Sequence, residues 1–328
     1  MQLRFVHLAG AAGLAFLPLG AIATQAGREA PNMTVRPMSA SVRPRTTAAP
    51  VSENVLIISI DGLRPDAIAR YRPAVLEQLV QEGAMARAAR TVYPSWTLPA
   101  HMSMLTGVPP KVHGITWNED LTAERGTVRA VTVFELAKAA GYTTALFVSK
   151  AKLKHLLKPG TLDHAAVPTG TTNLLATETV EAATRYILRR RPNLVFVHIA
   201  EPDYAGHSAG WMSTAYGWAV GRADAAVGQL KAAAEQAYGA GAYSIIVTAD
   251  HGGHGRNHGT ARDEDMQIPW IAWGAGVQPG IVETPVTTMD TGATVLWLLG
   301  IECPADWTGQ VVAAAVKTIP MVPVPRQE

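Results

Sequence analysis

Short, uninterrupted runs of apolar residues alternate along the chain with longer amphipathic stretches. The apolar runs are rich in β-branched residues and cover residues 55–60, 144–148, 194–199, 244–248 and, more weakly, 269–273. Helical patterns cover residues 74–82, 133–140, 177–190 and 216–238. Apolar runs of this kind are typical of strands buried on both faces of a parallel sheet. The alternation of strand and helix therefore predicts a three-layer α/β/α fold with a central, mostly parallel sheet.

The ends of the chain differ in composition from its middle. Residues 1–26 place Arg4 before an apolar stretch of small residues, which is typical of a secretory signal peptide. An uncleaved membrane anchor is the alternative, but Gly and Pro interrupt a stretch shorter than the ~20 apolar residues of a membrane span. Residues 27–53, rich in Pro, Arg, Thr, Ser and Ala, are expected to form a flexible linker. We expect a folded domain over 54–317 and an irregular tail over 318–328.

Composition and charge narrow the class of protein further. Of the 328 residues 48% are hydrophobic, enough for a large core, and 28 Lys and Arg against 26 Asp and Glu leave a net charge of +2. No dense basic run is present, so no nucleic-acid polymer is expected as a partner. The single cysteine, Cys303, excludes an intramolecular disulfide. We expect an exported protein, periplasmic or extracellular, without a transmembrane anchor; the sequence gives no indication of its oligomeric state.

Carboxylate and imidazole side chains follow three of the predicted strands. In open α/β sheets the carboxyl ends of parallel strands gather at one edge, so these side chains are expected to lie close together. Such ligands suit Zn²⁺, and six of them suffice for two neighbouring ions. The sequence therefore predicts a two-metal site. The six candidates are Asp61, Asp203, His207, Asp250, His251 and His258.

A hydroxyl side chain stands in a proline-rich stretch between the first two helical patterns. Residues 90–114 are interpreted as a loop in which Pro94 and Pro99 flank Thr97. The two prolines are expected to hold that loop stiff, which suits a nucleophile that must be aimed at phosphorus.

The order of the motifs resembles the nucleotide pyrophosphatase/phosphodiesterase (type I phosphodiesterase) family of the alkaline phosphatase superfamily. The resemblance covers residues 54–308 and implies an alkaline phosphatase-like catalytic domain over 54–317. It rests on five motifs in the family's order: Asp-Gly at 61–62, Tyr-Pro-Ser-Trp-Thr-Leu-Pro-Ala-His at 93–101, Leu-Thr-Gly and His-Gly-Ile at 105–115, Glu-Pro-Asp with Gly-His at 201–207, and Asp-His-Gly with a later His-Gly at 250–259.

The resemblance also implies roles for the candidate residues. It assigns Asp61, Asp250 and His251, with the Thr97 oxygen, to one Zn²⁺, and Asp203, His207 and His258 to the other. Thr97 then attacks phosphorus, and water hydrolyses the resulting phospho-threonine. Zinc is the expected metal, and other divalent metals such as Mn²⁺ stay open.

Four positions leave alternatives. His254 competes with His258 for the last ligand position, and His258 is preferred because Gly and a small hydroxyl residue follow it. Ala100 stands where the family's diesterases carry Asn, so a phosphate oxygen must be held by another group. Lys150 and Lys152 stand where some monoesterases of the superfamily place phosphate-binding residues.

Three functions follow from these features. The first is a phosphodiesterase or nucleotide pyrophosphatase acting on a small phosphate ester, nucleotides included. The second is a phosphomonoesterase with the same metals and nucleophile, in which Lys150 or Lys152 meets the extra negative charge. The third is a metal-containing binding protein without turnover. A sulfatase is excluded, because it needs Cys or Ser in place of Thr97 and Arg in place of His101.

Overall fold

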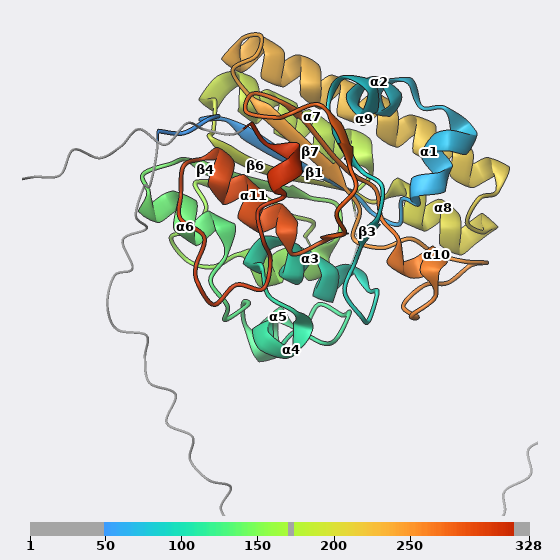
Figure 1. The fold of residues 1–328 in the computed structure, drawn as a ribbon. Helices are drawn as coiled ribbons and strands as arrows, with labels where there is room; N and C mark the ends of the chain where they lie inside the picture. The colour runs from blue at the N-terminus through green and yellow to red at the C-terminus, as the bar shows by residue number, and fades with distance from the viewer. Residues whose placement is uncertain (1–48, 170–173, 318–328) are drawn as a thin grey trace, which may run out of the picture. The chain divides into compact units, whose positions relative to one another are not determined.

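The computed structural model describes residues 49–169 and 174–317 (Figure 1). The predicted signal peptide, most of the predicted linker and the predicted tail lie outside the described residues, so export stays a prediction. Where the described chain begins, the backbone N–H groups of Val51 and Ser52 both donate to the carbonyl of Leu298, over 3.0 Å each. The chain is thus attached to the domain slightly before residue 54.

The sheet has eight strands in the order β5-β4-β6-β1-β7-β8-β2-β9. Neighbouring strands pair in parallel except at β8, which is antiparallel to both β7 and β2. The prediction of a mostly parallel sheet is therefore confirmed. The strands are β1 (Val55–Ile60), β2 (Ala84–Ala86), β4 (Thr144–Val148), β5 (His164–Ala166), β6 (Leu194–Ile199), β7 (Ser244–Thr248), β8 (Trp270–Gly274) and β9 (Gly280–Val282).

Helices cover both faces of the sheet, which confirms the three-layer α/β/α fold (Figure 1). The long helices on one face are α2 (Ala74–Glu82), α7 (Ala176–Arg190) and α9 (Thr214–Tyr238); those on the other are α3 (Thr97–Thr106), α6 (Val133–Ala139) and α11 (Asp290–Leu298). Shorter elements connect them: α1 (Pro65–Tyr71), α4 (Pro110–His113), α5 (Thr122–Arg125), α8 (Glu201–Ala209), α10 (Asp263–Met266), the 3₁₀ helices η1 (Ala151–Leu156) and η2 (Ala313–Ala315), and a ladder of β3 (Ala89–Arg90) with β10 (Val286–Thr287).

The apolar runs form the central strands because both faces of the sheet are covered. Every residue of β1, β4, β6 and β7 is buried. Helix α7 instead buries one stripe, Ala176, Thr179, Val180, Ala183 and Ile187, at the spacing of three and four residues that a helix lying on a sheet requires. These central strands are the ones whose ends carry the candidate ligands.

The predicted loop over residues 90–114 is wrong in its second half, where α3 and α4 lie. Thr97 is the first residue of α3, and Pro99 lies in its first turn. Backbone N–H groups of a first helical turn have no partner within the helix, so proline costs little there. All ten residues of α3 are buried, so the helix lacks the polar face that would have identified it.

The helices of the structure lie within residues 49–169 and 174–317. None of them combines the length and the apolar composition that a membrane crossing requires.

Candidate metal centre

Three adjacent strands bring the candidate ligands to one edge of the sheet. Strand β1 lies between β6 and β7, so the carboxyl ends of the three are neighbours. Asp61 directly follows β1, and Asp250 and His251 follow β7. After β6 the chain enters α8, where Asp203 and His207 stand one helical turn apart and face the same side.

The first cluster consists of Asp61, Asp250 and His251, all fully buried. The Nε2 atom of His251 lies 3.4 Å from Oδ1 of Asp61 and 3.3 Å from Oδ2 of Asp250. The hydroxyl of Thr97 is 3.4 Å from the same nitrogen. Thr97, at the start of α3, thus lies beside this cluster.

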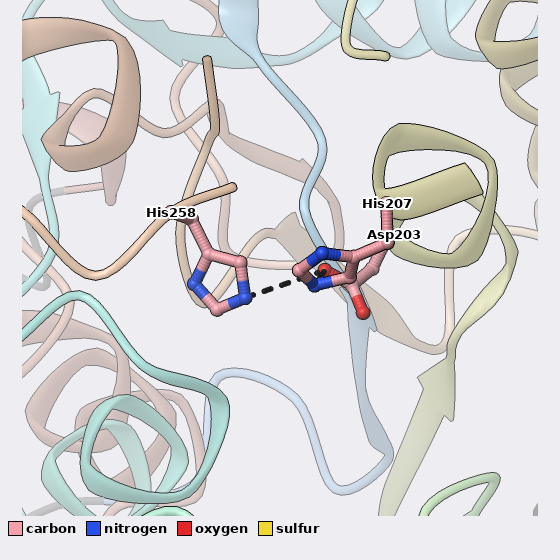
Figure 2. Close-up of side chains that lie close together, drawn as sticks. All are labelled: Asp203, His207 and His258. Carbon is pink, nitrogen blue, oxygen red and sulfur yellow. Dashed lines mark ion pairs between the residues drawn. The ribbon is translucent and has the colours of Figure 1, made fainter. Parts of the chain in front are cut away.

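The second cluster consists of Asp203, His207 and His258 (Figure 2). The Oδ1 atom of Asp203 lies 3.3 Å from Nε2 of His207 and 3.6 Å from Nε2 of His258. Asp203 and His258 are buried, whereas the side chain of His207 is 43% exposed. The second cluster is therefore the one that solvent reaches from the side of α8.

The three histidines present the same nitrogen to their cluster. In each, Nδ1 lies within 3.0 Å of a backbone carbonyl: Gly252 for His251, Arg256 for His207 and Ser95 for His258. A carbonyl only accepts hydrogen bonds, so Nδ1 carries a proton, and Nε2 is the nitrogen that can offer a lone pair to a cation. This orientation by a backbone carbonyl is the usual one for a metal-ligating histidine.

The carboxylates supply the complementary observation. One buried oxygen of each, Oδ1 of Asp61, Oδ1 of Asp203 and Oδ2 of Asp250, has no hydrogen-bond partner among the described residues. These are the oxygens that face the histidine nitrogens. Ligands about 2.0–2.1 Å from a tetrahedral Zn²⁺ lie roughly 3.3–3.4 Å from one another, close to the separations in both clusters. The donor set therefore fits two divalent cations.

The two clusters lie side by side. The rings of His251 and His258 stack with centroids 3.7 Å apart and planes 11° apart. The Nζ atom of Lys150, which follows β4 and is buried, lies 2.7 Å from Oδ2 of Asp61 and 2.6 Å from Oδ2 of Asp203. Lys150 thus bridges the outer oxygens of the two clusters.

Burial and the neighbouring charges together set the pKa values of the three carboxylates. Burial acts to raise the pKa of Asp61, but Lys150 and the hydrogen bond from His198 outweigh it and hold that pKa well below its usual value. The pKa of Asp203 is also lowered, since Lys150 and His207 outweigh burial and the charge of Asp61. For Asp250, burial and the charge of Asp61 raise the pKa.

All seven predicted residues, the six ligands and Thr97, lie in or beside one of the clusters. His254 lies outside both, because its Nδ1 donates to Asp265 over 2.7 Å. Lys152 is half-buried near Lys150, and burial together with the charge of Lys150 lowers its pKa. His101 is fully buried; its Nδ1 donates to the carbonyl of Thr97 over 2.7 Å and its Nε2 accepts from Ser59 over 2.9 Å.

Two residues at the site were not found from the sequence. His198, inside β6, places Nε2 2.9 Å from Oδ2 of Asp61; the only signal is a polar residue within an apolar run. Asn118 accepts a hydrogen bond from the backbone N–H of Leu98 over 3.0 Å. Its side chain therefore lies at the start of α3, one residue from Thr97. No local pattern marks Asn118.

Comparison with known proteins identifies the family. The family model for type I phosphodiesterase / nucleotide pyrophosphatase matches residues 55–263. The chain belongs to this family. GPI ethanolamine phosphate transferase 1 of Candida glabrata is 23% identical over 317 aligned positions, which cover 83% of this chain and 34% of the transferase. Ectonucleotide pyrophosphatase/phosphodiesterase family member 3 of Mus musculus is 26% identical over 214 positions, covering 60% of this chain and 24% of that protein. The chain thus spans well under half of either relative.

Solved structures of similar fold include two phosphate-related proteins. An inactive threonine-to-alanine variant of murine ectonucleotide pyrophosphatase/phosphodiesterase 5, in complex with AMP, aligns with a TM-score of 0.67 and 16% identity, over 78% of this chain and 97% of that one. Alkaline phosphatase PafA aligns with a TM-score of 0.69 and 13% identity, over 82% and 100%. These likenesses establish an alkaline phosphatase-like fold.

Proposed function

We propose that this chain hydrolyses phosphate esters, with the Thr97 hydroxyl as nucleophile and two divalent cations, zinc by preference, held by the two clusters. The observation that carries the proposal is the position of Thr97. Its hydroxyl lies 3.4 Å from Nε2 of His251, beside two clusters whose buried carboxylates each present one unpartnered oxygen. Membership of the type I phosphodiesterase family supports the same reading.

The residues around Thr97 are arranged to receive a phosphoryl group. Thr97 is the first residue of the ten-residue helix α3, whose N-terminus favours a negative charge. Asn118 accepts a hydrogen bond from Leu98, and its NH₂ group can donate one to a phosphate oxygen. It can therefore supply the phosphate contact that Ala100, which has no amide side chain, cannot make. His101 donates to the carbonyl of Thr97 and so fixes the first turn of the helix.

The chemistry takes two steps on the threonine oxygen. The Oγ1 atom of Thr97 forms a bond to phosphorus while the bond to the leaving oxygen breaks, and water then cleaves the Oγ1–P bond and restores the hydroxyl. The cations, when bound, supply Lewis acidity at the attacking and the leaving oxygen. The protein's part is to orient Thr97 and the ligands in a buried, preformed arrangement.

A diester substrate of the nucleotide type is our first candidate. The support comes from similarity: the murine family member 3 is named as a nucleotide pyrophosphatase/phosphodiesterase, and the structure of the inactive threonine-to-alanine variant of murine member 5 holds AMP. Because this chain spans a fraction of those proteins' length or shares little identity with them, the substrate is a proposal for this chain.

A monoester substrate is the second candidate, and Lys152 favours it. A phosphate monoester carries one more negative charge than a diester, and that charge must be met in the site. Lys150 is buried against Asp61 and Asp203, and their charges outweigh burial and raise its pKa. Lys152, half-buried nearby, has no such ion pair in the described residues and is the cation free to meet a phosphate.

The test compares p-nitrophenyl phosphate with the p-nitrophenyl ester of thymidine monophosphate on zinc-loaded protein. We expect a larger kcat/KM on the diester, loss of about 10³-fold or more in Thr97→Ala, and loss on chelation. Thr106→Val, which deletes a buried hydroxyl at the far end of α3, is the matched control and should keep its activity. A monoester preference that Lys152→Met abolishes selects the second candidate. Zinc-loaded protein that leaves both esters intact would contradict the proposal.

We further propose that the chain is exported and that residues 1–26 are removed. The proposal rests on the sequence of those residues alone. Cell fractionation followed by mass determination of the mature chain tests it, and a full-length mass in the cytosolic fraction would contradict it.

A further inference from the structure

One loop carries a ligand of each cluster. It covers residues 249–262, between β7 and α10, and is called the ligand loop below. His251 belongs to the first cluster and His258 to the second, so the shape of the ligand loop sets how far apart the clusters lie. Between them, His254 and Asn257 exchange two backbone hydrogen bonds of 2.9 Å. The loop is thus a compact hairpin with defined internal bonds.

The side chain of Asp265, in α10, closes this hairpin from outside. It is fully buried. Its Oδ1 accepts from Nδ1 of His254 over 2.7 Å, and its Oδ2 accepts from both the backbone N–H and the hydroxyl of Thr260, over 2.9 and 2.7 Å. Asp265 therefore holds the ligand loop on both sides of His258, four residues before it and two after.

Backbone contacts of α10 fix the other end of the loop. The carbonyl of Asp265 accepts from the N–H of Gly252, and that of Glu264 accepts from Gly253, over 2.9 and 2.7 Å. The space is tight: a Cβ at Gly252 would lie 2.0 Å from the Glu264 carbonyl, and one at Gly253 2.2 Å from the ring of Trp211. The loop therefore cannot rest on α10 in another register without losing these bonds.

The same anchor reaches the nucleophile. Thr260, held by Asp265, accepts through its carbonyl from the hydroxyl of Ser95 over 2.8 Å. The carbonyl of Ser95 in turn accepts from Nδ1 of His258 over 2.9 Å. Ser95 stands two residues before Thr97. A continuous set of hydrogen bonds thus runs from Asp265 through Thr260 and Ser95 to both the last ligand and the approach to the nucleophile.

The charge of Asp265 is suited to this position. Burial acts to raise the pKa of its carboxyl group, but the hydrogen bonds from His254 and Thr260 outweigh burial and lower that pKa. The carboxylate stays ionised in the interior, and ionised acceptors form the stronger hydrogen bonds. An amide in its place has one acceptor oxygen, so it cannot accept from both His254 and Thr260 as the two carboxylate oxygens do.

We propose that Asp265 is a positioning residue: it holds the ligand loop so that His258 completes the second cluster while His251 stays in the first. Asp265 touches no ligand atom itself and acts through His254, Thr260 and Ser95. The inference rests on the proposed function, since it takes the two clusters to be metal sites. It goes beyond that function in naming the side chain that sets the second site.

The experiment is a zinc titration of the full chain against a chromophoric chelator, which resolves the two binding steps. His258→Ala and Asp250→Asn assign the steps, because each removes a ligand from one cluster. We expect Asp265→Asn to weaken the second-cluster step by about 10–100-fold, the usual range for a group that orients a ligand, and to leave the first-cluster step unchanged. Asp263→Asn is the control, because Asp263 lies two residues away and forms an exposed ion pair with Arg90.

Two further variants test the inference if Asp265→Asn fails to fold. His254→Phe and Thr260→Val each remove one donor to Asp265, and each should weaken the same step by a smaller factor. A purely structural Asp265 would lower the melting temperature of the zinc-free variant and leave both zinc affinities as in the wild type. That result, or wild-type affinities in all three variants, would overturn the inference.

The role of Asp265 and the proposed hydrolase function can fail independently of one another. Phosphate esters left intact by wild-type protein that binds two zinc ions would overturn the hydrolase proposal and leave the role of Asp265 standing. Hydrolysis that requires Thr97, combined with wild-type zinc affinities in Asp265→Asn, would do the reverse. Wild-type protein that binds no zinc at the second cluster would overturn both.

Discussion

His198 holds Asp61 of the first cluster by a single bond. It is fully buried near the end of β6, where the N–H of Ser149 donates to its Nδ1. The ring proton is therefore on Nε2, which donates to Oδ2 of Asp61 over 2.9 Å. With Oδ2 held, Oδ1 faces His251. Lys150, whose Nζ lies 2.7 Å from the same Oδ2, and His198 together leave Oδ1 as the oxygen that faces a cation.

His198→Phe keeps the ring and removes this donor. We expect the first-cluster zinc affinity to fall by about 10–100-fold, and His198→Gln, whose amide can donate, to restore part of it. A competition titration with a chelator measures both. His164→Phe is the control, since His164 stacks on Tyr186 at the edge strand β5. Equal zinc affinity in His198→Phe and wild type would show that Asp61 needs no such support.

His113 should make the stability of the fold depend on pH. It is 4% exposed, its Nδ1 accepts from the N–H of Ile115, and Nε2 lies 3.0 Å from the hydroxyl of Ser103. Burial lowers its pKa from 6.5 to about 4. Between those values the unfolded chain binds the proton and the folded chain does not, so this contribution to stability is present above pH 6.5 and is lost as pH falls toward 4.

The loss from this one residue is about 2 kcal/mol at pH 5 relative to pH 7. Urea unfolding of the chelator-treated chain at the two pH values measures it. His113→Asn cannot titrate there, and its side-chain oxygen can still accept from Ile115. The variant should therefore lose about 2 kcal/mol less than the wild type between pH 7 and pH 5. An identical pH dependence in both proteins would mean that His113 does not titrate below its usual range.

Helices α3 and α4 each end at a glycine with a left-handed backbone. The last residue of α3 is followed by Gly107, with φ of +65°, where a Cβ would lie 2.0 Å from the ring of Trp307. Gly114 ends α4 with φ of +79° and has no atom within 4 Å of such a Cβ. The two glycines share a left-handed backbone and differ in the space beside them.

Alanine at the two positions separates backbone cost from steric cost. Gly114→Ala should destabilise by about 1–2 kcal/mol, the cost of a left-handed alanine. Gly107→Ala should cost that and roughly 1–3 kcal/mol more, because Trp307 must move. Urea unfolding of both variants gives the difference. Equal losses would indicate that Trp307 has room to shift and does not fix the end of the helix that carries Thr97.

The elements differ in how much of them could be predicted from the sequence. The central strands could be predicted because both their faces are buried, which leaves an uninterrupted apolar run. Strands of two or three residues, such as β3 and β10, have no period to detect and form because they pair with each other. Helix α3 was missed because it is buried on every side. Its hydrogen-bonded turns are satisfied internally, so burial needs no amphipathic pattern.

The residues of the site also divide into those that could be predicted from the sequence and those that could not. That the six candidate ligands lie together could be predicted, because the topology of a parallel sheet fixes where strand ends meet. Asn118 and Asp265 could not, since each acts through a contact that exists only in the folded chain: Asn118 with Leu98, twenty residues earlier, and Asp265 with the ligand loop. Lys150 stands between these cases. Its place after the second predicted strand can be recognised in the sequence, but its burial between two carboxylates depends on how β4 lies beside β6.

In the folded domain three carboxylates from separate segments meet in the interior. Asp61 acts to raise the pKa of both Asp203 and Asp250, so folding brings like charges together. Cations that bind the folded chain and not the unfolded one stabilise it by about 2.7 kcal/mol per site at a hundredfold excess over Kd. Zinc should therefore raise the melting temperature by roughly 10–20 °C for two sites in a domain of this size, and chelation should reverse the rise.

Asp250→Asn tests the same idea more directly, because the sign of its effect on the melting temperature should depend on whether zinc is present. With chelator, the variant should be at least as stable as the wild type: it removes a buried charge beside Asp61, while its side-chain oxygen can still accept from the N–H groups of Gly62 and His251. With zinc, the variant loses a ligand of the first cluster and should melt below the wild type. Melting curves of both proteins in chelator and in zinc test this reversal. A variant that melts below the wild type in chelator as well would mean that the charge of Asp250 does not destabilise the cation-free chain, and one that melts above it in zinc as well would mean that Asp250 does not help to hold the cation.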